Sequence, residues 1–294
     1  MISGKKILFL TPRFPFPLIG GDRVKPYHLI KYLCKNNEVT LVTFYQGKKL
    51  NSDYIKEIEN LGVKVYVVEI KAFKSALAIL FKKFWNLPLE IAFYKNSKFQ
   101  NLVNQLIDNN KFDLAFSFFM RTAEFIKDKK IPKVLIAEDC RTVYQHRSFK
   151  ETKKIIQKMV RMWESYLLSK YEPYISDFFD AVTLVTYEDI DAMRKMNNEA
   201  NYFLLTNGTD LNRYCLPKIN EERDGVLFAA KFDIWANVLM IDKIIKEILP
   251  IIRQKVPDFK FVFAGANPSE KLRNFIESNN CELYENVPDL APYM

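Results

Sequence analysis

The chain has 294 residues, of which 49% are hydrophobic and 27% charged, and its formal net charge is +9. These proportions are ordinary for a globular protein and exclude an extensively disordered chain, and the length allows two domains. With four widely spaced cysteines and two histidines, neither a zinc ribbon nor a histidine-rich metal site is expected, and a cytoplasmic location is favoured.

Strands are expected wherever a short apolar run is followed by a segment with helical periodicity. In the first two thirds of the chain the expected strands are Lys6–Leu10, Glu38–Phe44, Lys64–Glu69, Leu114–Phe118, Val134–Ala137 and Ala181–Val185. Helices are expected between them, at about 22–36, 51–61, 97–109, 121–128 and 150–175. Repeated switching between periods of two and 3.6 indicates βαβ units and a mostly parallel sheet.

A second series of elements follows a connection rich in Asn, Gly, Asp and Pro, residues 206–224. Strands are expected at Val226–Ala230, Phe259–Ala264 and Cys281–Tyr284, with helices at Val238–Arg253 and Ser269–Ser278. We therefore expect an N-terminal Rossmann-like domain over 1–205, a linker over 206–224 and a partial Rossmann-like domain over 225–294. The second domain has about half of the roughly six strands of a complete Rossmann-like domain.

Two adjacent glycines, Gly20 and Gly21, lie between the first strand and the first helix, with Arg23 in the helix's first turn. Glycine lets the backbone approach a ligand closely, and exposed N–H groups at a helix start bind phosphate. An ordinary turn is the alternative interpretation. Neither GxGxxG nor GxxxxGK[ST] is present, which argues against NAD dehydrogenases and P-loop proteins.

Three stretches, in this order, carry a resemblance to a known family: "ILFLTPRFPFPLIGGDRVKPYHLIKYLCKNNEVTLVTF", "FLLTNGTDLNRYCLP" and "VLFAAKFDIWANVLMIDKIIKEILPIIRQKVPDFKFVFAGANP". The sequence resembles the retaining "group 1" glycosyltransferases of the GT-B fold, whose members have two Rossmann-like domains. The resemblance implies transfer of a sugar from a nucleotide-sugar to a polysaccharide precursor or lipid-linked acceptor, with retention and without a cofactor or a metal. It also places Gly20 and Gly21 near the diphosphate and the acceptor.

Polar residues follow two of the buried strands, where open α/β sheets bind their ligands. Asp139 and Arg141 come after Val134–Ala137, and Arg121 comes after Leu114–Phe118. The resemblance implies that Asp139 contacts the reacting sugar or an acceptor hydroxyl. A helix cap is the alternative role for this aspartate.

In the second domain, Lys231 follows the first strand, where the family often has a cation against the nucleotide diphosphate. Such a cation would offset the charge of the leaving group. The sequence departs from the family at two positions, because Ala230 replaces a common glycine and Asn237 replaces a common second lysine. Asn237 remains a candidate contact of the nucleotide-sugar.

The glutamate pair of this family, E-x7-E, would lie beyond Met294. The resemblance therefore predicts weak, millimolar binding of nucleotide-sugars by residues 1–294. Three alternatives stay open: an inactive fragment of such an enzyme, another GT-B enzyme such as a sugar-nucleotide epimerase, and a peripheral membrane-binding scaffold.

Two basic segments contain many large apolar residues, Lys71–Lys95 and residues 147–161. The second holds six Lys or Arg against one glutamate. Such amphipathic segments bind anionic membrane surfaces, which would place the protein at the inner face of the cell membrane. For 147–161, a helix whose apolar side faces the core is at least as good an interpretation. Nucleic acid is not an expected partner, because no nucleic-acid-binding motif accompanies the charge.

Overall fold

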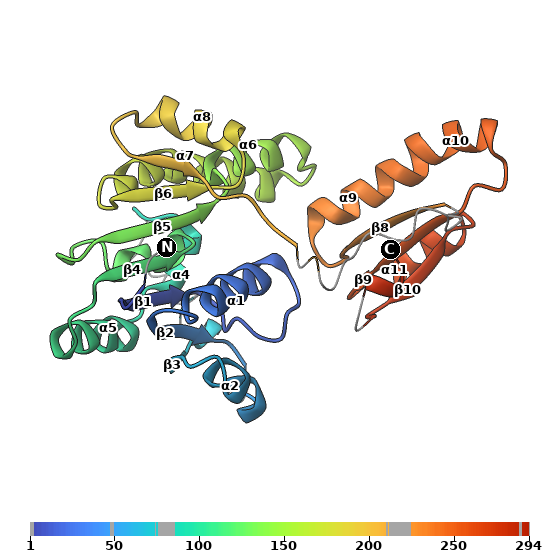
Figure 1. Cartoon of the computed structure of the whole chain (residues 1–294). Helices are drawn as coiled ribbons and strands as arrows, with labels where there is room; N and C mark the ends of the chain where they lie inside the picture. Colours follow the sequence, from blue (N-terminus) through green and yellow to red (C-terminus); the bar gives the residue numbers. More distant parts are fainter. Residues whose placement is uncertain are drawn as a thin grey trace. The chain divides into compact units, whose positions relative to one another are not determined.

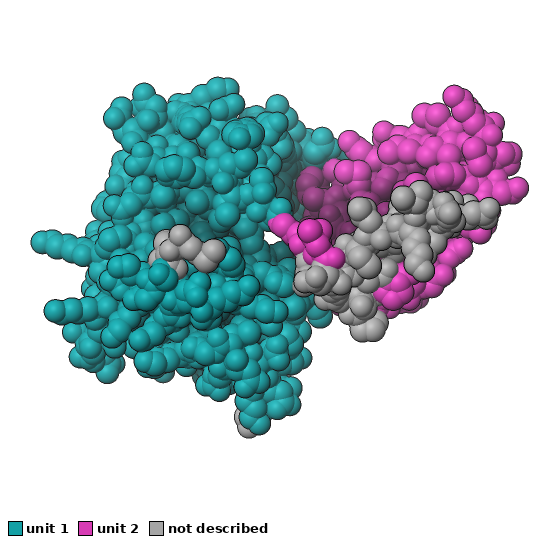
Figure 2. Space-filling model, in the orientation of Figure 1, with its two compact units in different colours: residues 1–207 teal, residues 208–294 magenta. Residues whose placement is uncertain are grey.

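The computed structural model describes residues 3–47, 50–73, 75, 86–209, 211, 225–287 and 290–293 (Figure 1). The chain divides into two compact units, residues 1–207 and residues 208–294, which are coloured separately in Figure 2. Most of the predicted linker, and most of the basic segment between Lys71 and Trp85, lies outside the described residues.

Unit 1 is built on a seven-stranded, entirely parallel sheet in the order β3-β2-β1-β4-β5-β6-β7. Its first six strands follow the order of a Rossmann-like sheet. The predicted α/β class with parallel sheets is confirmed. The strands are β1 (Lys6–Thr11), β2 (Glu38–Tyr45), β3 (Lys64–Glu69), β4 (Leu114–Phe118), β5 (Lys133–Glu138), β6 (Ala181–Leu184) and β7 (Tyr202–Leu204).

Helices cover both faces of this sheet (Figure 1). Successive residues of β1 point to opposite faces: Ile7 and Phe9 pack with α1 and α2, whereas Leu8 and Leu10 belong to the core that holds α5, α7 and α8. Near-continuous apolar strands of this kind are typical of a parallel sheet buried on both sides. The helices are α1 (Gly21–Leu33), α2 (Ser52–Glu59), α4 (Leu89–Tyr94), α5 (Ser97–Asn109), the 3₁₀ helix η1 (Met120–Phe125), α6 (Arg141–Glu151), α7 (Ile155–Ser176) and α8 (Tyr187–Met196).

Unit 2 has a smaller parallel sheet, in the order β10-β9-β8. Its elements are β8 (Val226–Lys231), α9 (Trp235–Lys243), the π-helix η2 (Ile244–Ile248), α10 (Leu249–Lys255), β9 (Phe261–Ala266), α11 (Glu270–Glu277), β10 (Glu282–Glu285) and the 3₁₀ helix η3 (Ala291–Tyr293). The single helix predicted over Val238–Arg253 contains the π-turn because Pro250 has no N–H to donate to the preceding turn.

Several other elements differ from the sequence prediction, which also lacked α4 and α8. The helix expected near 150–175 is two helices, since the chain is extended at Thr152 and Lys154, between α6 and α7. The segment 121–128 forms the 3₁₀ helix η1 instead of an α-helix. The strand β7 was not predicted, because it has three residues and buries only Tyr202.

Candidate functional site

The predicted polar residues of unit 1 lie where β4 and β5 end. Both strands are followed or terminated by a non-glycine residue in the left-handed region, Phe119 with φ 60° and Glu138 with φ 75°. Such backbone conformations are uncommon and concentrate at functional sites. After these bends, η1, which carries Arg121, and α6, whose first residue is Arg141, both begin at the same edge of the sheet.

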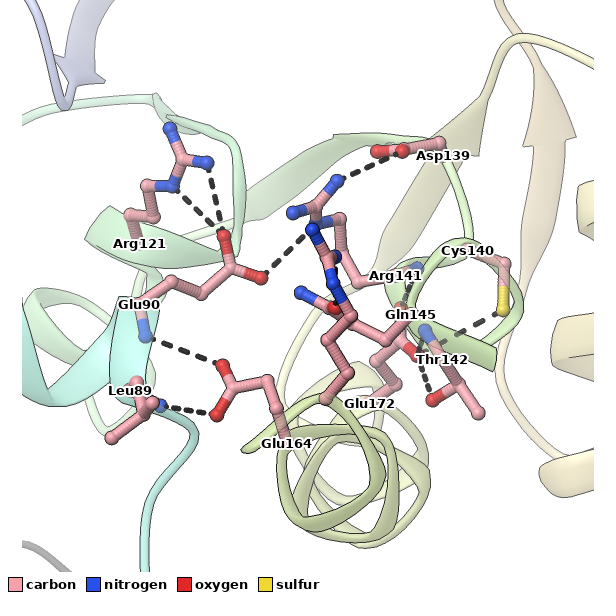
Figure 3. Close-up of polar contacts among 11 residues, drawn as sticks. Leu89, Glu90, Arg121, Asp139, Cys140, Arg141, Thr142, Gln145, Glu164 and Glu172 are labelled. Atoms are coloured by element: carbon pink, nitrogen blue, oxygen red, sulfur yellow. Dashed lines mark hydrogen bonds and ion pairs between the residues drawn. The ribbon is translucent and has the colours of Figure 1, made fainter. Parts of the chain in front are cut away.

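Glu90, in the first turn of α4, lies between these two arginines (Figure 3). Its Oε2 accepts from Arg121 Nε at 3.0 Å, and its Oε1 accepts from Arg141 Nε at 3.0 Å. Burial opposes ionisation of Glu90, but the charges of Arg121 and Arg141 outweigh burial and hold its pKa below the ordinary value. The three side chains therefore form one buried ion cluster.

Asp139 extends this cluster towards solvent. Its Oδ2 accepts from Arg141 Nη1 at 3.2 Å, on the side of the guanidinium away from Glu90 (Figure 3). The Asp139 side chain is 34% exposed, against 16% for Glu90. Burial raises the pKa of Asp139 despite the neighbouring Arg141. Asp139 thus offers the most accessible carboxylate of the cluster, and its carboxylate can accept a hydrogen bond from a ligand.

Two glutamates of α7 hold the surrounding helices in place. Glu164 accepts from the backbone N–H of Leu89 at 2.8 Å and of Glu90 at 3.4 Å, at the N-terminus of α4. Glu172 accepts from the N–H groups of Arg141 at 2.7 Å and Thr142 at 2.8 Å, at the N-terminus of α6. Carboxylates satisfy the unpaired N–H groups at helix starts and complement the helix dipole.

Burial also decides the protonation of Glu172 and Cys140. Glu172 is fully buried, and burial raises its pKa to about 7 against the opposing hydrogen bonds from Thr142. Burial and the neighbouring Glu172 raise the pKa of the Cys140 thiol to about 12. At neutral pH this thiol stays protonated, so Cys140 is not a nucleophile.

The glycine pair lies at the same edge of the sheet, after β1. Gly20 precedes α1 with φ 91°, where a Cβ would also approach Asp22 Oδ1 to 2.9 Å, so this position requires glycine. A Cβ on Gly21 would meet nothing within 4 Å. No side chain caps the start of α1, and the first N–H groups of a helix have no partner within it. The open space and these donors fit an anionic ligand, whereas the Asp22 carboxylate in the first turn opposes one and is itself paired with Arg13 at 2.7 Å.

Lys25 and Arg23, both in α1, differ in whether they form an ion pair. Lys25 forms an ion pair with Glu138 at 2.6 Å and donates to the carbonyl of Leu205 at 2.9 Å. It therefore ties α1 to the ends of β5 and β7 and does not face a ligand. Arg23 is half-buried and forms no ion pair within the described ranges.

The carboxyl edge of the sheet in unit 2 carries a second, separate set of polar groups. Lys231 Nζ lies 3.3 Å from Asp233 Oδ2. The amide of Asn237 donates to the Lys231 carbonyl at 2.8 Å, so it supports the backbone after β8. Asn267, at the end of β9, donates to Asp233 at 3.3 Å.

The structure thus brings Arg121, Asp139 and Arg141 together and places Gly20 and Gly21 at the same sheet edge. Sequence reasoning missed the three glutamates that organise the cluster. A signal existed for Glu172, which interrupts the apolar stripe of α7 between Leu168 and Ile175. An acid on a buried stripe indicates a specific partner.

Comparison with solved structures identifies the fold as GT-B-like. TarM superimposes with a TM-score of 0.62 at 12% identity, over 98% of this chain and 78% of that protein. An α,α-trehalose-phosphate synthase (UDP-forming) from Burkholderia xenovorans superimposes with a TM-score of 0.55 at 9% identity, over 98% of this chain and 76% of that protein. A putative UDP-N-acetylglucosamine 2-epimerase from Listeria monocytogenes superimposes with a TM-score of 0.52 at 12% identity, over 99% of this chain and 71% of that protein. No protein-family model and no curated protein matches the sequence.

Proposed function

We propose that this protein is a nucleotide-sugar-dependent glycosyltransferase that passes a sugar, with retention, to a polysaccharide precursor or a lipid-linked acceptor. The observation that carries the proposal is the ion cluster of Glu90, Arg121, Asp139 and Arg141 at the carboxyl edge of a GT-B-like unit. Its location is where open α/β sheets bind ligands. The UDP-forming activity in the name of the Burkholderia structure supports a nucleotide-sugar as substrate.

In this proposal each of the site residues of unit 1 has one role. Asp139 accepts a hydrogen bond from the acceptor hydroxyl or the reacting sugar. Arg141, fixed by Glu90, holds Asp139 in position, and Arg121 pairs with the other oxygen of Glu90. The backbone at Gly20 and Gly21 leaves room for the sugar and for phosphate.

In unit 2, Lys231 is proposed to offset negative charge on the leaving diphosphate. Its side chain is 30% exposed and already faces Asp233, so its contribution is moderate. Asn237 is proposed as a positioning residue for Lys231, since it binds the Lys231 carbonyl.

Gly21→Val is expected to weaken nucleotide-sugar binding without unfolding the protein. The new side chain points into open space in the structure, which is the space assigned to the ligand. We expect wild-type binding near 1 mM and a loss of at least about tenfold in the variant. Titration by ligand-observed NMR with a panel of nucleotide-sugars measures both, and Gly21→Ala, which adds only a Cβ, should have a smaller effect.

The same titration tests the second unit. Lys231→Ala should weaken binding by about twofold to fivefold, as expected for a partly exposed charge. Lys255→Ala is the matched control, because Lys255 is an exposed lysine in the last turn of α10. Binding that neither Gly21→Val nor Lys231→Ala changes would place the site elsewhere.

Asp139→Asn is expected to reduce sugar transfer by about 10-fold to 100-fold, the value of one hydrogen bond to a charged group. Mass spectrometry of the products after incubation with nucleotide-sugars and cell-derived glycans and lipids measures transfer.

The likeness to the Listeria structure makes epimerisation the second candidate. Conversion of the nucleotide-sugar to its epimer without an acceptor would replace the proposed reaction, and an absence of any product with every acceptor would favour the inactive alternative.

A further inference from the structure

The first half of α7 carries large apolar side chains that the protein does not bury. Ile155 and Ile156 are 77% and 78% exposed, and Trp163 is 49% exposed. Met159, Val160 and Met162 are exposed as well. The second half of the same helix is different, because Leu167, Leu168, Tyr171 and Ile175 are buried in the core of unit 1. The predicted alternative of a core-facing helix is therefore wrong for residues 155–163.

Lengths of the elements explain why this segment leaves the core. α6 starts at the carboxyl edge of the sheet, directly after β5, and α7 ends just before β6 begins at the opposite edge. α6 has 11 residues and α7 has 22, or about 16 Å and about 33 Å. The turn between these two packed helices therefore lies beyond the carboxyl edge, on the same side as the ion cluster (Figure 1). We call residues 147–163 the α6–α7 corner.

Positive charge surrounds the apolar residues of the corner. Its cations are Arg147, Lys150, Lys153, Lys154, Lys158 and Arg161, and its one acid is Glu151. Two of the cations have neighbours within the corner or on α6: Lys158 lies 4.9 Å from the centre of the Phe149 ring, and Arg161 donates to Gln145. Lys150, Lys153 and Lys154 are exposed to solvent.

We propose that the α6–α7 corner docks on an anionic lipid bilayer. Exposed aliphatic and tryptophan side chains framed by cations match the interface between acyl chains and negatively charged headgroups. A protein partner would need a continuous apolar patch, bordered by acids, in a shape that fits the corner. A bilayer supplies apolar chains and negative charge without a specific shape. Within the described ranges, no helix has the length and apolar content needed to cross a bilayer.

One helix joins the corner to the ion cluster. Glu164, which caps α4 and so positions Glu90, follows the exposed Trp163 directly. Docking through residues 147–163 would therefore bring the ion cluster close to the lipid surface. This arrangement suits a lipid-linked acceptor, but the docking itself does not depend on the proposed transfer reaction.

The test is sedimentation of the whole chain with vesicles, in the absence of any nucleotide-sugar. Wild-type protein is expected to bind vesicles containing about 30% phosphatidylglycerol, and far less to neutral phosphatidylcholine. The combined change Lys150→Glu, Lys153→Glu and Lys154→Glu should lower affinity by at least about a hundredfold. Replacing Ile155, Ile156 and Met159 by glutamine should lower it by at least about tenfold, through lost apolar contact.

The matched control reverses three exposed lysines at the opposite edge of the sheet, Lys64, Lys111 and Lys130, each located before or at the start of a strand. This variant has the same net charge as the corner triple and should bind within about twofold of wild type. Equal losses in both triples would show a general charge effect and overturn the proposal. Failure of wild-type protein to sediment, or a dimer that only the Ile155/Ile156/Met159 variant dissociates, would also overturn it, the latter in favour of a second copy of the chain.

Discussion

Glu90→Ala is expected to lower the free energy of unfolding by about 3–5 kcal/mol, because removing one partner of a buried ion cluster leaves a cation uncompensated. In the wild type both arginines face this carboxylate at 3.0 Å, and the side chains of Arg121 and Arg141 are 21% and 18% exposed. Truncation would leave Arg121 without its carboxylate and Arg141 paired with Asp139 alone. Urea denaturation followed by circular dichroism measures the loss.

A double variant separates charge imbalance from lost packing. If uncompensated charge causes the effect, Glu90→Ala together with Arg121→Ala should cost less than the sum of the two single changes. Asp53→Ala breaks the exposed pair with Lys56 and removes the acid in the first turn of α2, and should lower the free energy of unfolding by no more than about 1 kcal/mol. Additive losses in the double variant would contradict the charge explanation.

The stability of the protein is expected to fall between about pH 5 and pH 8 because of Glu172. Its pKa in the folded protein is raised to about 7 from an ordinary value of 4.5, and burial is the main cause. The folded protein therefore binds a proton on Glu172 that the unfolded chain has released, so this contribution is fully present at acidic pH and is lost as pH rises through 7. The shift corresponds to about 3 kcal/mol.

Glu172→Gln isolates this effect from the other buried carboxylates. The carboxamide has the shape of a protonated glutamic acid and does not titrate, but its NH2 group cannot accept one of the two backbone N–H groups that the Glu172 oxygens accept. The variant should be less stable than wild type near pH 5, because it loses one of these hydrogen bonds, and should lack the Glu172 component of the decline towards pH 8. Parallel stability curves for the two proteins, measured by thermal unfolding at several pH values, would refute the assignment to Glu172.

Most of the sheet could be predicted from the sequence because its strands are long apolar runs. Lys64–Glu69 and Leu114–Phe118 match the structure at both ends. The failures occurred where the sequence signal is short or where distant residues decide the outcome. β7 has only three residues, and no proline or glycine marks the break between α6 and α7 in the sequence.

Part of the site could be predicted by the same local reasoning. Arg121, Asp139 and Arg141 follow buried strands closely in the sequence, so the rule for carboxyl ends was sufficient to select them. The contacts that hold these three residues together could not be predicted from the sequence. Glu90 contacts Arg141 across 51 positions, and Glu164 binds Leu89 across 75. Contacts of such separation are set by the packing of α4 and α7 against the sheet, and a single sequence does not show it.

The pairing of the ion cluster has a consequence for which molecules this sheet edge attracts. Glu90 and Asp139 match the charges of Arg121 and Arg141 one for one, so the cluster generates little long-range field. The cluster itself should therefore add little electrostatic steering to the encounter with a ligand. The cluster therefore selects by hydrogen-bond geometry at contact, which suits an uncharged hydroxyl such as the one proposed to contact Asp139.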